Sequence, residues 1–461
     1  MTGLIIRGGT VVTPAGQQRA DVAIDGGVIT AIEPELAGGA EELSASGLVV
    51  LPGVIDVHLH FNEPGRASWE GAATGSRALA AGGGTLFFDM PLNSTPCTVD
   101  TAAFDDKRAA LEARSITDFG LWGGLVPGNV GEMAALAARG VVGYKAFMCD
   151  SGLPEFPRAD DVTLLEGMRE AARLDLPVAV HAESDELTRT LSARMTGRGV
   201  RDFLASRPIV AELDAIQRAL LFAHDTGARL HLVHVSSGRG VAMAAAARVR
   251  GVDVSIETCP HYLFFTDDDL ERLGAVAKSA PPLRPADARE ALWRELLHGH
   301  VDIVASDHSP SEPSLKAGDF IAAWGGIAGV QSTLAVLLDR GHHQRGLPLE
   351  RVAALTAGVP SQRFRIERKG AIAVGYDADL VLVDPSASFT LDAADLQQRH
   401  RTSPYVGTTF RGRVVRTIRR GETIFADGRI VARTPGRMVR PQHVGSVRSA
   451  APRTHAQLPA P

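Results

Sequence analysis

The chain has 461 residues, of which 45% are hydrophobic and 22% are charged, and its formal net charge is -5 at pH 7. This length and apolar content are enough for a large buried core, which we expect to form one large and one smaller domain. The weakly negative charge lacks the basic footprint of a nucleic-acid-binding protein. No apolar segment is long enough to span a bilayer, and the N-terminus lacks the features of a signal peptide.

The cysteines are few and scattered. Cys97, Cys149 and Cys259 form no CxxC pair. Their spacing therefore favours neither a disulfide framework nor a cysteine zinc site. We expect a protein of the reducing cytoplasm that acts on a small molecule, with no nucleic-acid or membrane partner.

Both ends of the chain contain short apolar runs separated by glycine turns, a pattern typical of short strands. Apolar runs of this kind lie at residues 4–6, 21–24, 378–383 and 417–418. Asp25-Gly26-Gly27 and Asp427-Gly428 are typical turn sequences between strands. We therefore predict a small β-sandwich domain made from residues 1–50 and 370–433.

The middle of the chain alternates apolar runs with helical stretches rich in Ala, Leu, Arg and Glu. We count eight runs, at residues 54–57, 85–88, 120–122, 141–144, 177–180, 230–233, 252–256 and 301–305. Short, nearly all-apolar strands separated by helices are typical of a parallel sheet covered on both faces. Eight units predict an α/β fold, a (β/α)8 TIM-like barrel over residues 51–369. An open doubly wound sheet is the alternative, but no G-x-G-x-x-G turn favours it.

The C-terminal segment differs from the rest of the chain. Residues 434–461 are rich in Pro, Arg, Ser and Ala. Such a composition buries little apolar surface, so we predict a flexible tail.

Chemically active side chains follow several of the predicted barrel strands. The first strand ends in His58-Leu59-His60. Because residues i and i+2 of a strand point to the same face, both imidazoles can reach one ion. Other strand ends carry Lys145, His181, His234 and Asp307. Catalytic groups of such barrels lie at the carboxyl ends of the strands, so we expect these six side chains to meet.

These residue types together point to metal chemistry, although a lone histidine near a strand end is usually structural. Imidazole and carboxylate ligands suit a divalent first-row metal. A lysine in an apolar run is costly to bury, and burial lowers its pKa. The neutral amine can then attack carbon dioxide. We hypothesise that Lys145 is carboxylated and becomes an anionic ligand able to bridge two cations.

Longer strings surround these residues. They include residues 60–66 (HFNEPGR), 69–71 (WEG), 89–94 (DMPLNS), 206–208 (SRP), 259–262 (CPHY), 306–310 (SDHSP), 316–318 (KAG), 323–327 (AWGGI) and 403–407 (SPYVG). With them the chain resembles the amidohydrolase superfamily, in the branch of dihydroorotases, dihydropyrimidinases and allantoinases. The resemblance runs from Gly53 to about Gly421 and is greatest to the allantoinase family.

The resemblance implies a binuclear metal centre and a role for each of the six residues. The first cation would be held by His58, His60 and Asp307, the second by His181 and His234, with carboxylated Lys145 between them. Asp307 would also be the catalytic acid and base. Zinc is the expected metal, and manganese, cobalt and iron suit the same ligands. A homodimer or homotetramer is also implied.

Two positions separate the members of this branch. Dihydroorotases carry an arginine two residues after the second histidine, where it pairs with the substrate carboxylate. This chain has Asn62 there, which suits allantoin because allantoin has no carboxylate. Dihydropyrimidinases carry a tyrosine five residues after the lysine, and this chain has Asp150. Arg66 and Arg284 remain possible substrate ligands, with surface or loop-bracing roles as the simpler interpretation.

We therefore expect hydrolysis of the hydantoin ring of allantoin to allantoate. The alternatives are a hydantoinase or dihydropyrimidinase activity, or a scaffold relative without catalysis, which usually lacks metal ligands. Asp307 would take a proton from the attacking water and return it to the leaving nitrogen. Substrate-binding candidates are Asn62, Asn93, Ser279 and Gly326; Asn93 and Gly326 also suit turns.

Overall fold

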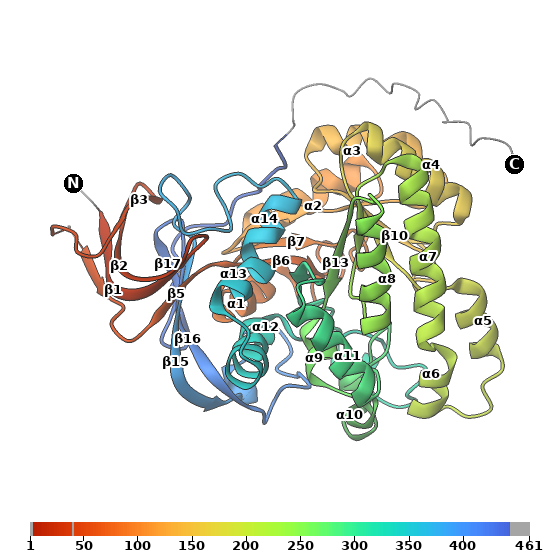
Figure 1. The fold of residues 1–461 in the computed structure, drawn as a ribbon. Coiled ribbons are helices and arrows are strands. Elements are labelled where there is room, and N and C mark those ends of the chain that lie inside the picture. The colour runs from red at the N-terminus through yellow and green to blue at the C-terminus, as the bar shows by residue number, and fades with distance from the viewer. Residues whose placement is uncertain (1–2, 39–40, 443–461) are drawn as a thin grey trace, which may run out of the picture.

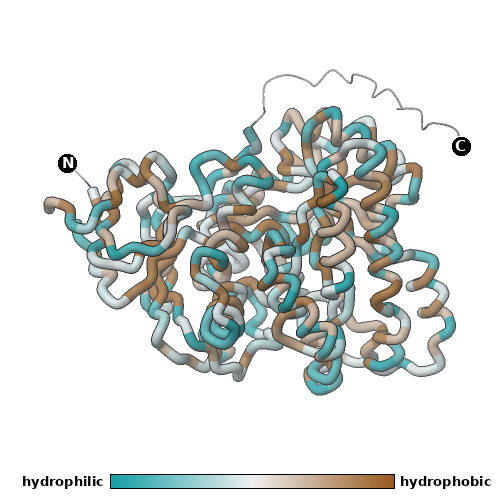
Figure 2. The backbone as a smooth tube through the Cα atoms, viewed as in Figure 1, coloured by the Kyte–Doolittle hydropathy of each residue, from teal (hydrophilic) through white to brown (hydrophobic). Residues whose placement is uncertain are grey.

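The computed structural model describes residues 3–38 and 41–442. A (β/α)8 barrel forms the larger body, and a small β-sandwich domain lies at its side (Figure 1). Hydrophobic residues run along the strands, while hydrophilic residues dominate the outer turns (Figure 2). No helix in the described part of the chain has the length and apolarity needed to cross a membrane.

The barrel strands are parallel and almost wholly buried. They are β6 (Val54–Leu59), β7 (Gly84–Asp89), β8 (Asp118–Leu121), β9 (Gly123–Gly124), β10 (Tyr144–Phe147), β11 (Val178–His181), β12 (Leu230–Leu232), β13 (Val254–Thr258) and β14 (Ile303–Val304). Pairing runs from β6 through β7 to β8, and from β9 through to β14. Trp122 separates β8 from β9, and an isolated bridge between Leu59 and His308 joins the first strand to the segment after the last.

Helices connect these strands. In chain order they are α1 (Ala72–Ala81), α2 (Thr101–Arg114), α3 (Met133–Arg139), α4 (Asp161–Arg173), α5 (Asp185–Ala193), α6 (Val200–Ser206), α7 (Ile209–Thr226), α8 (Gly238–Val249), α9 (Pro260–Phe264), α10 (Asp267–Leu273), α11 (Ala286–Leu297), α12 (Thr333–Val336), α13 (Leu349–Ala353) and α14 (Val359–Arg363). Their buried faces consist mainly of Ala, Leu and Met, which pack against the apolar strands as such helices require.

One barrel strand lies three residues later than its apolar run predicts. The run at residues 141–144 is buried, but the pairing of β10 begins only at Tyr144, opposite Val178. A Cβ at Gly143 would meet Pro177 O and Trp122 at 2.6 Å, so the chain passes this point in close contact with its neighbours. Lys145 therefore lies within the strand rather than after it.

The β-domain combines strands from both ends of the chain in one hydrogen-bonded sheet. Its strands are β1 (Leu4–Thr13), β2 (Gly16–Asp25), β3 (Val28–Glu33), β4 (Glu41–Ser44), β5 (Val49–Pro52), β15 (Leu380–Thr390), β16 (Thr409–Arg419), β17 (Glu422–Ala426) and β18 (Arg429–Ile430). Apolar residues from both chain ends, such as Ile6, Val22 and Leu382, pack in one cluster. Each of the two predicted glycine turns joins a pair of these strands.

Part of the predicted tail packs on the barrel. Gly436 N donates to Ser115 O, and Val439 N donates to Phe119 O, while Phe119 N donates to Arg437 O. Residues 436–439 thus run beside β8, which differs from the flexible tail predicted from residue 434 onward. The remainder of the tail, residues 443–461, lies outside the described residues. Backbone pairing to a strand needs no apolar side chains, so the composition did not signal it.

Candidate active site

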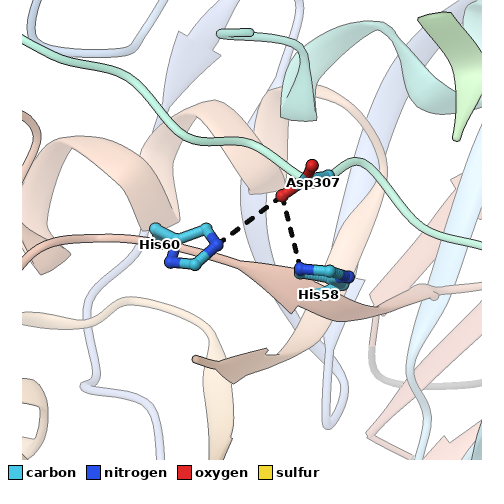
Figure 3. Close-up of side chains that lie close together, drawn as sticks. All are labelled: His58, His60 and Asp307. Atoms are coloured by element: carbon cyan, nitrogen blue, oxygen red, sulfur yellow. Dashed lines mark ion pairs between the residues drawn. The ribbon is translucent and has the colours of Figure 1, made fainter. Parts of the chain in front are cut away.

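Three of the predicted ligands meet where the barrel closes. Asp307 Oδ1 lies 3.3 Å from His58 Nε2 and 3.5 Å from His60 Nε2 (Figure 3). Their ligand atoms all lie within 4.8 Å of one another. His60 N also donates to His308 O at 2.8 Å, so the ends of the first and last strands are joined beside this cluster. The geometry suits a divalent cation bound by two imidazoles and one carboxylate.

The other three predicted ligands continue this cluster across the barrel. The His234 ring lies 5.4 Å from that of His58 and 4.6 Å from that of His181, measured between ring centroids. Lys145 Nζ lies 5.1 Å from the centre of the Phe147 ring, which stacks on His181 at 4.4 Å. The tertiary structure therefore brings all six residues into one buried site.

Lys145 is a buried amine without a hydrogen-bond partner in the described part of the chain. Desolvation lowers its pKa to about 8, although the nearby carboxylates of Asp307 and Glu257 oppose the shift. An appreciable fraction of the amine is neutral near neutral pH, and a neutral amine is the form that attacks carbon dioxide.

Glu257, on β13, connects the two halves of the site. Its Oε1 lies 2.8 Å from His58 Nδ1 and accepts the backbone N–H of His234 at 3.1 Å. Its Oε2 lies 3.0 Å from His231 Nε2. Burial opposes the charge on Glu257, but the interactions with His58 and His231 lower its pKa to about 2. The ionised carboxylate thus turns His58 Nε2 towards Asp307.

Glu183 positions the ring of His181 in a similar way. Its Oε2 lies 2.8 Å from His181 Nε2 and also accepts a hydrogen bond from Arg207, so the carboxylate holds the His181 ring in place. Burial opposes the charge of Glu183, while Arg207 lowers its pKa to about 2. A neutral imidazole fixed in this way is suited to metal binding.

Several site residues have unusual backbone conformations. The φ angles of Asn62, Asn93, His234 and Asp307 are 63°, 67°, 40° and 44°. Residues other than glycine rarely adopt these values, and they are costly unless the surrounding structure enforces them. For Asp307, burial opposes ionisation, but charge interactions with His58 and the hydrogen bond to His60 hold its pKa well below the usual range.

The predicted substrate residues surround the loop that follows Asp307. Asn93 Nδ2 donates to Ser309 Oγ at 3.4 Å, and a Cβ at Gly326 would lie 2.2 Å from Ser309 O. Gly326 N donates to Lys278 O, next to Ser279, whose hydroxyl donates to Pro281 O. Asn62 is fully buried and donates to Pro310 O at 3.1 Å.

The two arginines considered as substrate ligands have other partners. Arg66 pairs with Glu155 at 2.6 Å. Arg284 is buried, and it donates to Ser236 Oγ at 2.9 Å and to Arg207 O. Both arrangements brace loops.

Sequence reasoning did not single out Glu183, Glu257 and His261. Glu183 follows His181 by two residues, just after the end of β11, and Glu257 directly follows the apolar run at residues 252–256, so each carboxylate lies close to a predicted strand end. His261 lies in the CPHY string; its ring is buried, its Nε2 has no partner among the described residues, and burial lowers its pKa to about 4. One of its ring nitrogens lies within 4.8 Å of ligand atoms of Asp307 and Cys259.

The comparisons with known proteins identify the family of this chain. The model of the amidohydrolase family matches residues 49–424. The chain belongs to the amidohydrolase family. A curated amidohydrolase relative from Solibacter usitatus, named allantoinase, is 62% identical over 96% of this chain and 98% of its own length. Another allantoinase, from Rubrobacter xylanophilus, is 59% identical over 95% of this chain and 98% of its own.

A solved amidohydrolase structure has nearly the same fold. The L-hydantoinase (dihydropyrimidinase) from Arthrobacter aurescens superposes with a TM-score of 0.93 at 32% identity, and covers 95% of this chain and 100% of that one. These findings confirm the predicted family and the predicted barrel with its β-sandwich domain.

Proposed function

We propose that this amidohydrolase is a cyclic amide hydrolase that opens the hydantoin ring of allantoin to give allantoate. The observation that carries the proposal is the convergence of His58, His60, Asp307, His181, His234 and Lys145 in one buried site, in a chain whose relatives at 42–62% identity are named allantoinase. The complete set of six side chains argues against a scaffold relative that has lost its ligands.

The donor set fits two divalent cations. Four imidazoles and a carboxylate match the preferences of zinc, and an unpartnered buried amine has no structural explanation within the described residues. We propose that His58, His60 and Asp307 hold one cation, that His181 and His234 hold the other, and that carboxylated Lys145 joins them. Such cations, when bound, lower the pKa of water and polarise a carbonyl group.

Side chains of the protein transfer the protons during hydrolysis. Hydrolysis adds the oxygen of water to the ring carbonyl carbon and breaks the bond from that carbon to the ring nitrogen. Asp307 is ionised at neutral pH, so its carboxylate can accept the proton that water loses. It returns this proton to the departing nitrogen, which leaves as a neutral group. Glu257 and Glu183 hold the imidazoles around it in position.

Substrate choice rests on the loop after Asp307. We propose that Asn93, Ser279 and the backbone at Gly326 orient the polar groups of the ring. Asn62 provides a neutral amide where a carboxylate-binding arginine would otherwise stand, and its full burial leaves little room for a longer side chain. The site therefore favours an uncharged ureide over a ring that bears a carboxylate.

A substrate panel tests the proposal. Purified protein is assayed for ring opening of allantoin, hydantoin, dihydrouracil and dihydroorotate, with metal content measured in parallel. We expect allantoin to have the highest kcat/KM, and chelation to abolish turnover. A higher kcat/KM with hydantoin or dihydrouracil would replace the proposal by the hydantoinase alternative, which the likeness to the Arthrobacter enzyme keeps as the second candidate.

We further propose a homodimer or homotetramer in the reducing cytoplasm. Three buried, unpaired cysteines are compatible with that compartment. The oligomeric state rests on the family resemblance, and light scattering of the purified protein measures it directly.

A further inference from the structure

A second group of metal-ligand side chains lies at the end of α11, at the opposite end of β14 from Asp307. Glu295, His298 and His300 place a carboxylate oxygen and two ring nitrogens within 4.8 Å of one another. His300 Nδ1 lies 2.6 Å from Glu295 Oε2. The rings of His298 and His300 lie 6.0 Å apart. None of these residues takes part in the proposed catalytic site.

The helix ending holds these three residues in a defined arrangement. Gly299 has a φ of 85°, and its N–H donates to Leu296 O. The N–H of His300 donates to Glu295 O at 3.0 Å. These two bonds form a Schellman motif, in which the residue after the glycine folds back over the last helical turn. The backbone therefore places His300 directly beside Glu295.

The same motif ends other barrel helices with apolar residues at the matching positions. At the end of α8, Val252 N donates to Ala247 O, and at the end of α4, Leu176 N donates to Ala171 O. A hydrophobic contact between these two positions is the usual companion of the motif. At α11 an imidazole and a carboxylate replace that contact, with a second imidazole, His298, at the position between them. The fold does not require this replacement.

The surroundings also suit a cation. The last carbonyl groups of a helix carry partial negative charge, which favours a positive ion. Arg351 donates to Gly299 O at 3.4 Å and to Val301 O, which fixes the backbone of the turn. Glu295 is partly buried and His300 is about half exposed, so an ion has access from solvent.

We propose that Glu295, His298 and His300 bind a first-row divalent cation such as zinc, at a peripheral site separate from the proposed catalytic centre. Two imidazoles and one carboxylate provide three ligands, and water completes the coordination. The ion connects the end of α11 to the segment that enters β14. The N-terminal face of a barrel is the stability face, so the site stabilises this connection rather than taking part in turnover.

Zinc titration of the tag-free holoenzyme tests the site. At micromolar free zinc, we expect the wild type to take up one equivalent more than the double variant His298→Asn with His300→Asn. Turnover of the two proteins should be equal, which also shows that the variant is folded. Glu295→Gln, which keeps the shape of the side chain but removes the anionic ligand, should weaken the extra binding by at least about 10-fold, because the loss of a direct ligand costs no less than the loss of an outer partner.

The matched control is a second histidine pair outside the proposed catalytic site, His342 and His343, whose rings lie 4.9 Å apart. No carboxylate or cysteine joins this pair in a metal-ligand group among the described residues. The variant His342→Asn with His343→Asn should keep the additional equivalent of zinc. Equal zinc uptake by the wild type and the His298/His300 variant, or uptake only at millimolar zinc, would overturn the proposal.

Discussion

Glu257 Oε1 lies 2.8 Å from His58 Nδ1, so a carboxylate outside the proposed ligand set decides how a ligand ring is turned. The same oxygen accepts the backbone N–H of His234, which belongs to the other half of the site. One buried side chain therefore positions one ligand of each of the two proposed cations.

We expect Glu257→Gln to lower metal affinity by about 10- to 100-fold, because an amide cannot accept from both histidine rings as the carboxylate does. Metal retention after dialysis at a buffered free-metal concentration measures the effect. Added metal should recover much of the activity. Glu170→Gln, on the outer face of α4 beside Arg173, is the control and should bind metal normally. Normal retention in Glu257→Gln would show that the carboxylate is only structural.

Asp307→Asn should lower kcat by about 100- to 10,000-fold, the usual contribution of a general acid–base group, or more if metal is lost as well. Turnover of metal-reconstituted protein is the measurement. Asp302→Asn is a suitable control, because Asp302 pairs with Arg248 away from the site. Turnover near the wild-type rate in Asp307→Asn would remove the residue from its proton-transfer role.

Carboxylation of Lys145 should depend on pH. Its pKa of about 8 lies below the ordinary value, so the neutral fraction rises from roughly one-tenth at pH 7 to one-half at pH 8. Chelated protein that is given metal at constant dissolved carbon dioxide should therefore recover activity about fivefold faster at pH 8 than at pH 7.

The lowered pKa of Lys145 also affects the stability of the metal-free protein. Because the folded pKa lies below the unfolded value, the metal-free protein should gain stability between about pH 8 and pH 10.5. Lys145→Met should lack this gain relative to wild type, as well as the carbon-dioxide dependence. If the recovery of activity depends on neither pH nor carbon dioxide, carboxylation of Lys145 is contradicted.

Gly326→Ala should disturb the loop after Asp307. A Cβ there would lie 2.2 Å from Ser309 O, at a φ of 138° that side chains rarely adopt. We expect a loss of roughly 1–3 kcal/mol in stability and a fall in kcat/KM. Its neighbour provides the control, since a Cβ at Gly325 has no heavy atom within 4 Å. Equal Tm and kcat/KM in the two alanine variants would show that the loop tolerates the change.

The segment 434–442 should contribute to stability. It takes part in backbone hydrogen bonds with Ser115, Phe119 and Arg365, each worth about 0.5–1.5 kcal/mol. A chain that ends at Arg433 should therefore unfold at a lower temperature than one that ends at Gln442. Identical melting curves would mean that these bonds are replaced by water at no cost.

Much of the site could be predicted because its signals are local. A His-x-His pair at a strand end places both rings on one face, and His181, His234 and Asp307 each follow an apolar run. The start of β10 was less predictable. Close packing at Gly143 places its first paired residue, Tyr144, three residues after the start of the apolar run. Glu183 and Glu257 lie close to predicted strand ends, but the Glu257 partners His58 and His231 come from other strands, and only the His181 partner of Glu183 is close in sequence.

The sequence by itself determined the family, the alternation of strands and helices, and the residue types of the site, since these follow from periodicity and from strings of neighbouring residues. Only the tertiary structure decided which ring nitrogen faces Asp307, that Lys145 has no hydrogen-bond partner among the described residues, and that Asn62 donates to Pro310 O. These features depend on contacts between strand ends that are far apart in the chain. The left-handed φ angles of His234 and Asp307 have the same origin, because packing rather than local preference enforces them.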